Sequence, residues 1–478
     1  MRVERECTIL PNREGKNQSR LYAFFTFPIK VGLSSLSVKV SFSSVNPSQL
    51  PFALFDPSGH IRVLQAPEGG IGKQEYCYHL SSSARETGTV SGPLQEGEWK
   101  GVIFKRRFVE PISVLVTLEG KEGVCSALYS SYSFPNRILG GDGWYEGELH
   151  VHSNHSTGRD SVSAIFDEAQ NVGLDFISLT DHFTSSHWAD IDRTIGNRPL
   201  ICLQSMELSG NRGHAGLQGI SSWCFPFVDE NEELCYFLGI RHSPTMNDVA
   251  DKIHNEGGLF AVNHPLSGLV GWRYHTFDMT KADLLEIWCT SDRETTFLYP
   301  TLWDSYLARG YRLIGVGSSD SHKVSSHPTW QLGLIRTIIH ASEFSQRGLL
   351  DGLKRGEAYV AMGVSRLSFS ALVDGNRYPM GSCVPVRHAD FEVEIRHHPS
   401  GNLFIMVDGQ IHDIIHFPEG DDIYRFSLES RDFALQGPVP SFVRLEYHED
   451  LEKARYFGMA FRDWRTMRLL SNPIWLKG

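Results

Sequence analysis

The sequence predicts a protein of three modules, with an α/β region between two β regions. Three observations predict this arrangement: the length, the spacing of the apolar residues and the positions of turn-forming clusters. At 478 residues the chain is long for one domain, and roughly 150 residues per domain suggests about three. Hydrophobic residues make up 41% and charged residues 21%, an ordinary globular composition that excludes a disordered or fibrous chain.

Residues 1–140 are predicted to form an N-terminal β-sandwich. Leu36, Val38, Val40 and Phe42 alternate with polar residues, and the same period of two returns over residues 112–118. Turn-forming clusters separate such runs, and a Gly-rich segment just before residue 144 is a plausible linker.

Residues 144–365 are predicted to alternate strands with helices. Apolar spacing and capping residues predict a helix after Ser161, a second over 246–256 with Thr245 as its N-cap, a third over 301–309 and a fourth after Ser342. Such alternation implies a parallel sheet or barrel, in which functional groups lie at the carboxyl ends of the strands.

Residues 366–478 are predicted to form a C-terminal β module. Phe391, Val393 and Ile395 alternate with charged residues. The runs at 403–407 and 411–417 are joined by Asp408-Gly409, a pair typical of tight hairpin turns.

Charge and terminal sequence narrow the expected partners. The net charge is −11, and the longest basic run has three residues, at 105–107. A long nucleic acid is therefore not expected as a partner, whereas a small-molecule substrate is. The N-terminus lacks an apolar signal region, and no stretch approaches 18 uninterrupted apolar residues, so we expect a cytoplasmic protein with no membrane partner.

Histidine is the most informative residue type. Thirteen of the 21 histidines lie between residues 150 and 340, and five apolar runs in this region end in imidazole or carboxylate side chains. These side chains are His150 and His152, Asp181 and His182, Glu207, His264, and Asp320 and His322. Five strand ends that deliver such groups to one rim predict a metal centre, and ligands without thiolate suit zinc, manganese or iron.

The ordered motifs resemble the PHP (polymerase and histidinol phosphatase) family of metal-dependent hydrolases. They are His150-x-His152, Thr180-Asp181-His182, Met206-Glu207, His264-Pro265 and Asp320-Ser321-His322. Additional features resemble the CehA/McbA-type branch, which includes a carbamate-insecticide hydrolase. They are Gly213-His214, Glu286-Ile287-Trp288, the run at 356–360 and the terminal segment at 471–475.

The resemblance implies a distorted (β/α)7 barrel over about 145–365 that holds two or three divalent metal ions. One ion would bind His150, His152, Glu207 and Asp320; a second would share Glu207 with His214 and His264; a third would bind His182 and His322. The family's S-D-G continuation is replaced by Ser156-Thr157-Gly158, so the third position would lack its usual acid unless His155 or Asp160 supplies a ligand.

We therefore expect a metal-dependent hydrolase that uses metal-bound hydroxide, with a small phosphoester as substrate. His182 or His322 is the candidate for protonating the leaving group. The main alternative is hydrolysis of a carbamate or carboxyl (aryl) ester, as in carbaryl hydrolases. Two other readings are an amidohydrolase-type deaminase or lactonase and a non-catalytic binding protein stabilised by metal.

The surroundings of the centre discriminate between the two ester classes. A rim of Arg and Lys side chains would favour phosphate, and an apolar, aromatic pocket near Trp272 would favour an aryl ester. Candidate rim residues are Arg159, Arg241, Arg273 and Lys323, and candidate pocket residues are Trp272 and Tyr274.

Overall fold

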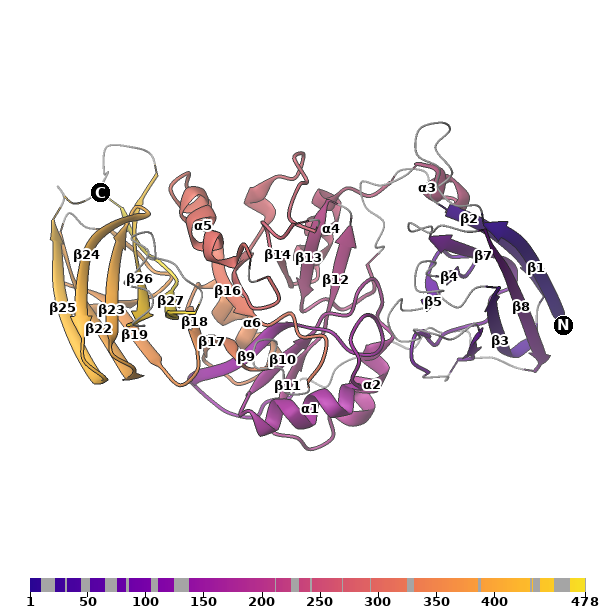
Figure 1. The fold of residues 1–478 in the computed structure, drawn as a ribbon, viewed down its shortest axis with the longest axis horizontal. Coiled ribbons are helices and arrows are strands. Elements are labelled where there is room, and N and C mark those ends of the chain that lie inside the picture. The colour runs from indigo at the N-terminus through magenta and orange to yellow at the C-terminus, as the bar shows by residue number, and fades with distance from the viewer. Residues whose placement is uncertain are drawn as a thin grey trace.

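The computed structural model describes most of the chain. The described residues are 1–9, 22–30, 32–43, 52–64, 75–82, 86–104, 111–123, 137–210, 212–224, 232–240, 243–268, 270–292, 294–324, 331–385, 388–429, 432, 439–450 and 465–477. None of the helices among these residues is long and apolar enough to cross a bilayer. The chain is a multidomain mixed α/β protein with several β-sheets, and its two β-rich ends lie on opposite sides of the α/β region (Figure 1).

Two antiparallel four-stranded sheets form the N-terminal part and face each other across one core. The first has the order β1 (Arg2–Ile9), β8 (Ile112–Glu122), β3 (Leu33–Phe42) and β6 (Glu75–Leu80). The second has the order β2 (Tyr22–Ile29), β7 (Gly97–Phe104), β4 (Phe52–Phe55) and β5 (Ile61–Leu64). Leu36, Val38 and Val40 are fully buried, as their alternation with polar residues predicts.

The middle region contains strands of two further sheets. One begins with β11 (Ile201–Leu203), β10 (Phe176–Leu179), β9 (Gly143–Val151), β17 (Ile335–Ala341) and β18 (Ala358–Met362). The other is β12 (Ser205–Gly210), β13 (Gly213–Gln218), β14 (Leu259–Asn263), β15 (Leu284–Cys289) and β16 (Ile314–Ser318). At the ligand end, single bridges join them at Val151 with Ser321 and at His182 with Glu207. The hydrogen-bonded ladders therefore do not close into one barrel.

Two details of the predicted α/β region are wrong. The apolar run at 200–207 is two strands in different sheets, because the chain passes from β11 to β12 at Gln204. The sheet is also mixed, since β13 runs antiparallel to both β12 and β14. A continuous apolar run does not reveal such a crossing, because both strands are buried.

The predicted helices are present. They are α1 (Val162–Asn171), α4 (Met246–Asn255), α5 (Tyr299–Leu307) and α6 (Gln346–Lys354). Ser161 and Thr245 cap α1 and α4, and Thr245 forms a full capping box with Asp248. Two helices were not predicted, α2 (His187–Thr194) and α3 (Glu232–Leu238), and both are short, with eight and seven residues. Single 3₁₀ turns lie at Met279–Lys281 and Thr296–Leu298.

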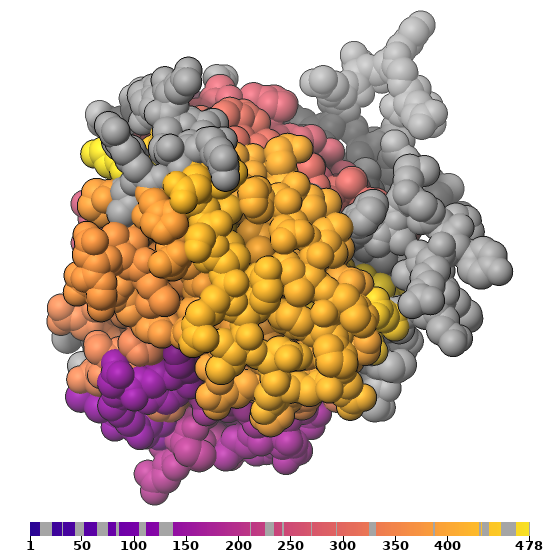
Figure 2. Space-filling model, turned by 90° about the vertical axis from the view of Figure 1, so that its left-hand side faces the viewer, coloured from indigo at the N-terminus to yellow at the C-terminus, as the bar shows by residue number. Residues whose placement is uncertain are grey.

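The C-terminal strands continue a sheet of the middle region. From β18 the sheet runs through β27 (Met467–Ser471), β26 (Ser441–Glu449), β23 (Gly401–Val407) and β24 (Gln410–Phe417), and β28 (Ile474–Lys477) links β26 to β21 (Cys383–Pro385). A separate sheet has the order β20 (Asn376–Pro379), β19 (Arg366–Val373), β22 (His388–His398) and β25 (Gly420–Glu429). Figure 2 shows these residues, in orange and yellow, covering most of this end of the molecule. The module boundaries stay a prediction, because one sheet crosses residue 365.

The predicted hairpin at 403–417 is present as β23 and β24. Its turn residues Asp408 and Gly409 both have positive φ, 50° and 78°, as a two-residue turn of this handedness requires.

A buried ion pair ties the C-terminal strands to the α/β region. Arg444 of β26 is fully buried and donates to both carboxylate oxygens of Asp304 on α5, at 2.6 and 2.7 Å. A second carboxylate, Glu446, lies 2.7 Å away, and the guanidinium packs over the Trp303 ring. The positive charge of Arg444 offsets two buried carboxylates, so its loss would affect both of them.

Replacing Arg444 with Met should destabilise the fold by about 3–5 kcal/mol, because the buried carboxylates of Asp304 and Glu446 would lose the cation that both contact. Arg377→Met is the matched control, since Arg377 pairs with Glu392 at the surface, where such pairs contribute about 0–1 kcal/mol. Urea unfolding followed by circular dichroism measures both free energies of unfolding. Equal losses in the two variants would contradict the structural role of Arg444.

Candidate metal centre

Histidine and carboxylate side chains from several strands converge at one end of the two middle sheets. The elements are β9 with the residue after it, the ends of β10, β14 and β16, and the strands β12 and β13. Their side chains are His150, His152, His182, Glu207, His214, His264, Asp320 and His322. The structure thus brings together every residue that the sequence predicted as a metal ligand, and their roles as ligands remain a prediction.

Glu207 lies at the centre of this group and is fully buried. Its Oε1 lies 3.1 Å from His150 Nε2, 3.4 Å from His214 Nδ1 and 3.6 Å from His264 Nε2. Its Oε2 lies 2.8 Å from His182 Nδ1 and 3.6 Å from His152 Nε2. Because its two oxygens face different histidines, this carboxylate can bridge two cations.

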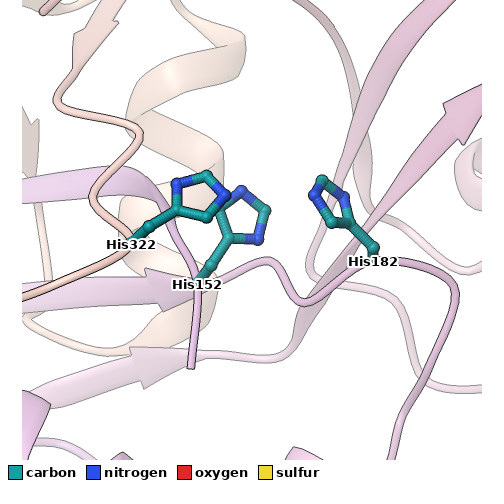
Figure 3. A group of neighbouring side chains, drawn as sticks. All are labelled: His152, His182 and His322. Carbon is teal, nitrogen blue, oxygen red and sulfur yellow. The ribbon is translucent and has the colours of Figure 1, made fainter. Parts of the chain in front are cut away.

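Three sets of side chains have ligand atoms close enough to hold an ion. They are His150 with His152 and Asp320, His150 with Glu207 and His264, and His152 with His182 and His322. Figure 3 shows the rings of the last set, which come from three separate segments and turn toward a common space. The sets differ in two ways from the ligands expected for each ion. His150 also lies with Glu207 and His264, and His152 also lies with His182 and His322. His214 belongs to none of the three sets but lies beside Glu207, with its ring 4.7 Å from that of His264.

The donor atoms fit a metal ion. Asp320 Oδ1 and His214 Nδ1, which both face this group, are buried without a hydrogen-bond partner. Buried polar atoms rarely stay unpaired, and a cation satisfies lone pairs on imidazole and carboxylate alike. His150 Nε2 and His152 Nε2 also lie 3.1 Å apart, a distance at which both can face one ion.

The electrostatics of the cluster keep acids ionised and one imidazole neutral. Burial, together with the charges of His182 and His322, lowers the pKa of His152 to about 3, so this imidazole is neutral and able to bind metal at neutral pH. Burial opposes ionisation of Glu207 and Asp320, but the neighbouring histidines outweigh it and hold the pKa of both carboxyls well below the ordinary range. Burial likewise opposes the protonation of His150, yet Asp320, Glu207 and Glu286 together raise its pKa well above 6.5.

Four polar residues that support the ligands were not identified from the sequence as site residues. Glu286 of β15 accepts from the backbone N–H of His264 at 2.6 Å and lies 3.2 Å from His150 Nδ1. Asn263 donates to Glu207 Oε1 at 2.7 Å, and Ser291 donates to Asp320 Oδ2 at 2.7 Å. Ser209 contacts both His182 Nδ1 and Glu207 Oε2. Only Glu286 carried a signal in the sequence, as part of the Glu286-Ile287-Trp288 feature.

Several neighbouring residues point to other partners. The Asp181 carboxylate accepts hydrogen bonds from Ser153 and Ser156 and so holds the loop after β9. It also lies 3.4 Å from His187 Nδ1. His155 contacts Ser186 at 2.8 Å and Asp190 at 3.1 Å. Asp160 accepts from the Val324 N–H at 2.8 Å. Neither His155 nor Asp160 belongs to one of the three ligand sets, and their part in the third position stays a prediction.

The backbone at the ligand end is held in unusual conformations. His264 and Asp320 have φ values of 24° and 52°, a region that non-glycine residues rarely occupy. Glu148 anchors this end, because its buried carboxylate accepts from the Ser319 N–H and from the hydroxyls of Ser318 and Ser319. Gly158 lets the first loop close, since a Cβ there would lie 2.2 Å from the His152 carbonyl oxygen.

Basic residues lie close to the cluster in the chain, whereas the two candidate pocket residues belong to or pack against the core. Arg159 and Lys323 are exposed, and the Arg159 N–H donates to the His322 carbonyl at 2.9 Å. Arg212 and Arg273 are also exposed and joined by a backbone hydrogen bond next to the segment of His214. Trp272 and Tyr274 instead pack against each other and the main core, and Tyr274 is 3% exposed. Arg241 lies outside the described residues.

Metal affinity should rise with pH between pH 6 and 8. The raised pKa of His150 favours a proton on this imidazole in the metal-free protein, and an ion must displace that proton to bind it. One displaced proton makes affinity rise about tenfold per pH unit. Competition of Zn²⁺ between the protein and a chromogenic chelator at pH 6, 7 and 8 measures the slope. The same affinity at all three values would contradict this reading of His150.

Comparisons with known proteins show only distant similarity. No family model matches the chain, and neither does any curated protein. A two-domain protein from Bacteroides vulgatus, containing a predicted PHP-like metal-dependent phosphoesterase, is 15% identical, with a TM-score of 0.38, over 71% of this chain and 97% of its own.

Two other solved structures have lower scores. A proposed metal-dependent phosphoesterase from Bifidobacterium adolescentis is 16% identical, with a TM-score of 0.29, over 39% of this chain and 90% of its own. An amidohydrolase from Chromobacterium violaceum with bound sulfate and no metal is 15% identical, with a TM-score of 0.26, over 39% of this chain and 89% of its own. Scores and identities this low do not show the family of the chain.

Proposed function

We propose that the protein is a metal-dependent hydrolase that cleaves a small phosphoester. One observation carries the proposal: a fully buried carboxylate, Glu207, is surrounded by five imidazoles within 3.6 Å. Asp320 extends this group toward His322 and completes one of the three ligand sets. A structural role alone would not account for the buried His214 Nδ1 and Asp320 Oδ1 atoms in this group, which have no hydrogen-bond partner.

The ligands and the residues that support them would have different roles in ester hydrolysis. Divalent ions held by these side chains would lower the pKa of water and offset negative charge that develops on the ester oxygens. Glu286 and Asn263 hold His150, His264 and Glu207 in place. His322 Nδ1 donates to the Asp320 carbonyl at 3.0 Å, so Nε2 is the atom that can bind an ion or, when protonated, donate to the leaving group.

The surroundings of the centre support a phosphoester. Arg159 and Lys323 flank the segment of His322, and exposed Arg and Lys side chains bind phosphate oxygens well. The aromatic pair Trp272 and Tyr274, which would have favoured an aryl ester, is occupied in packing the core. The same features support a small anionic substrate over a long polyanion, given the net charge of −11.

A carbamate or aryl carboxyl ester is the second candidate. Phe183 follows His182 directly, and the two rings lie 6.2 Å apart. Trp223 donates a hydrogen bond to the Phe183 carbonyl. These two partly buried aromatic side chains offer an apolar surface beside the third ligand set. The CehA/McbA-like motifs, including Gly213-His214 and Glu286-Ile287-Trp288, support the same candidate.

The finer expectations from the sequence are part of the proposal. We propose two to three ions of zinc, manganese or iron, because the ligand atoms are nitrogen and oxygen. We also propose that the two middle sheets act as a distorted PHP-like barrel around the centre, and that the protein works in the cytoplasm on a small molecule without nucleic-acid or membrane partners.

Reconstituted protein should hydrolyse p-nitrophenyl phosphate faster than p-nitrophenyl acetate or a p-nitrophenyl carbamate. The charge near His322 predicts this order, and Arg159→Ala should raise KM for the phosphate ester more than for the acetate. Release of p-nitrophenol measures all rates. Preference for the carbamate would replace the phosphoester with the second candidate, and no hydrolysis of any ester by metal-loaded protein would contradict the hydrolase proposal.

His322→Ala should slow turnover about 100-fold or more while at least two metal ions remain bound, because general acid catalysis contributes about 10²–10⁴-fold and His322 belongs to only one ligand set. His254→Ala, on α4 and paired with Asp283, is the control and should leave both properties unchanged. Turnover and elemental analysis give the two quantities. Loss of all metal from His322→Ala would show that the three sets are not separable.

A further inference from the structure

We propose that the N-terminal β-sandwich positions His182, through Trp223 and Phe183, and thereby controls the affinity of the third ligand set for metal. This set is His152 with His182 and His322. The inference rests on the proposed metal centre and assigns the N-terminal sheets a part in it.

The backbone around His182 is fixed by hydrogen bonds on both sides. The Phe183 N–H donates to the Glu207 carbonyl at 3.0 Å, and the Glu207 N–H donates to the Asp181 carbonyl at 3.3 Å. On the far side, Trp223 Nε1 donates to the Phe183 carbonyl at 3.1 Å. Of these three hydrogen bonds, the one from Trp223 is donated by a residue that does not lie at a strand end of the ligand group.

Phe183 needs this support because its φ is 61°. A residue with a Cβ avoids this left-handed conformation unless its surroundings hold it there. Loss of the support would let the peptide relax, and the His182 side chain, one residue away, would turn with it.

The support continues into the N-terminal sandwich. Phe183 and Trp223 pack against a buried cluster that contains Phe55 and Ile61 of the β2-β7-β4-β5 sheet and Leu234 of α3. Phe237 of α3 stacks on Phe24 of β2, with ring centroids 4.3 Å apart. Figure 1 shows α3 lying against β2 and β7, away from the other helices. This helix therefore joins the two parts of the chain.

The third set is the one most open to such control. The side chains of His182 and His322 are 16% and 32% exposed, whereas those of the other six candidate ligands are at most 13% exposed. Dense packing fixes the buried ligands from all sides. Ser209 and Glu207 hold the His182 ring at Nδ1, and the Trp223 and Phe183 contacts hold the backbone that carries this ring.

Two variants test the coupling in the full-length protein. Trp223→Phe removes the indole donor but keeps an aromatic ring, and Phe237→Ala removes the stacking contact between α3 and β2. Tyr236→Ala is the control, because Tyr236 lies on the same helix and is 87% exposed. Stepwise Co²⁺ titration of metal-free protein, followed by visible absorption, gives the number of ions bound and the Kd of each.

Both variants should bind the weakest ion about tenfold less tightly, the lower end of the effect of supporting residues on metal affinity, and the first two ions as before. Tyr236→Ala should match the wild type. A role confined to folding would lower the unfolding midpoint without this selective loss. If Phe237→Ala does not fold, Trp223→Phe alone decides.

The inference is overturned if Trp223→Phe binds all ions with wild-type affinities, or if the wild type binds only two. Either result leaves the hydrolase proposal standing. Conversely, a wild type that binds three ions but hydrolyses no ester removes the proposed function while the titration still tests the coupling.

Discussion

The burial of the Glu207 charge is the constraint on which the rest of the site depends. A carboxylate removed from water is costly unless cations or donors surround it, and Glu207 is fully buried. Five imidazoles and the Asn263 amide meet this requirement, and they come from β9, the ends of β10 and β14, and β13. These elements must therefore end at the same place, which fixes how the two middle sheets meet.

A frame of buried acids keeps the ligands in register. Glu148 ties the start of the His150 and His152 segment to Ser318 and Ser319, just before Asp320. Glu286 contacts both the His150 ring and the His264 backbone N–H. Asp181 accepts from the Ser153 N–H in the loop that follows His152. Because each acid links two segments that are distant in sequence, the strained backbone at His264 and Asp320 is held by contacts rather than by local preference. Supporting residues of this kind set both the orientation and the basicity of metal ligands.

The sequence allowed prediction of the elements and ligands that depend on local pattern. Apolar spacing and caps located α1 and α4, strand ends marked by His or acid located seven of the eight candidate ligands, and the family resemblance added His214. It did not allow prediction of the break at Gln204 or of the antiparallel β13, because buried strands look alike whichever sheet they join. Ser209, Asn263 and Ser291 were missed for a related reason: their role comes from a contact across strands, and a single serine or asparagine has no pattern of its own. The α3 contact with the N-terminal sheet is likewise visible only in three dimensions.

The central claim is that Glu207 organises a metal centre, and the metal content of Glu207→Gln beside the wild type tests it most directly. Glutamine has nearly the same shape but no charge, so the surrounding imidazoles lose the anion that gathers them. After loading with Zn²⁺ or Mn²⁺ and gel filtration, elemental analysis should find two or more ions per wild-type chain and fewer than one in the variant. Equal metal content in the two proteins, or fewer than one ion in the wild type, would contradict the account.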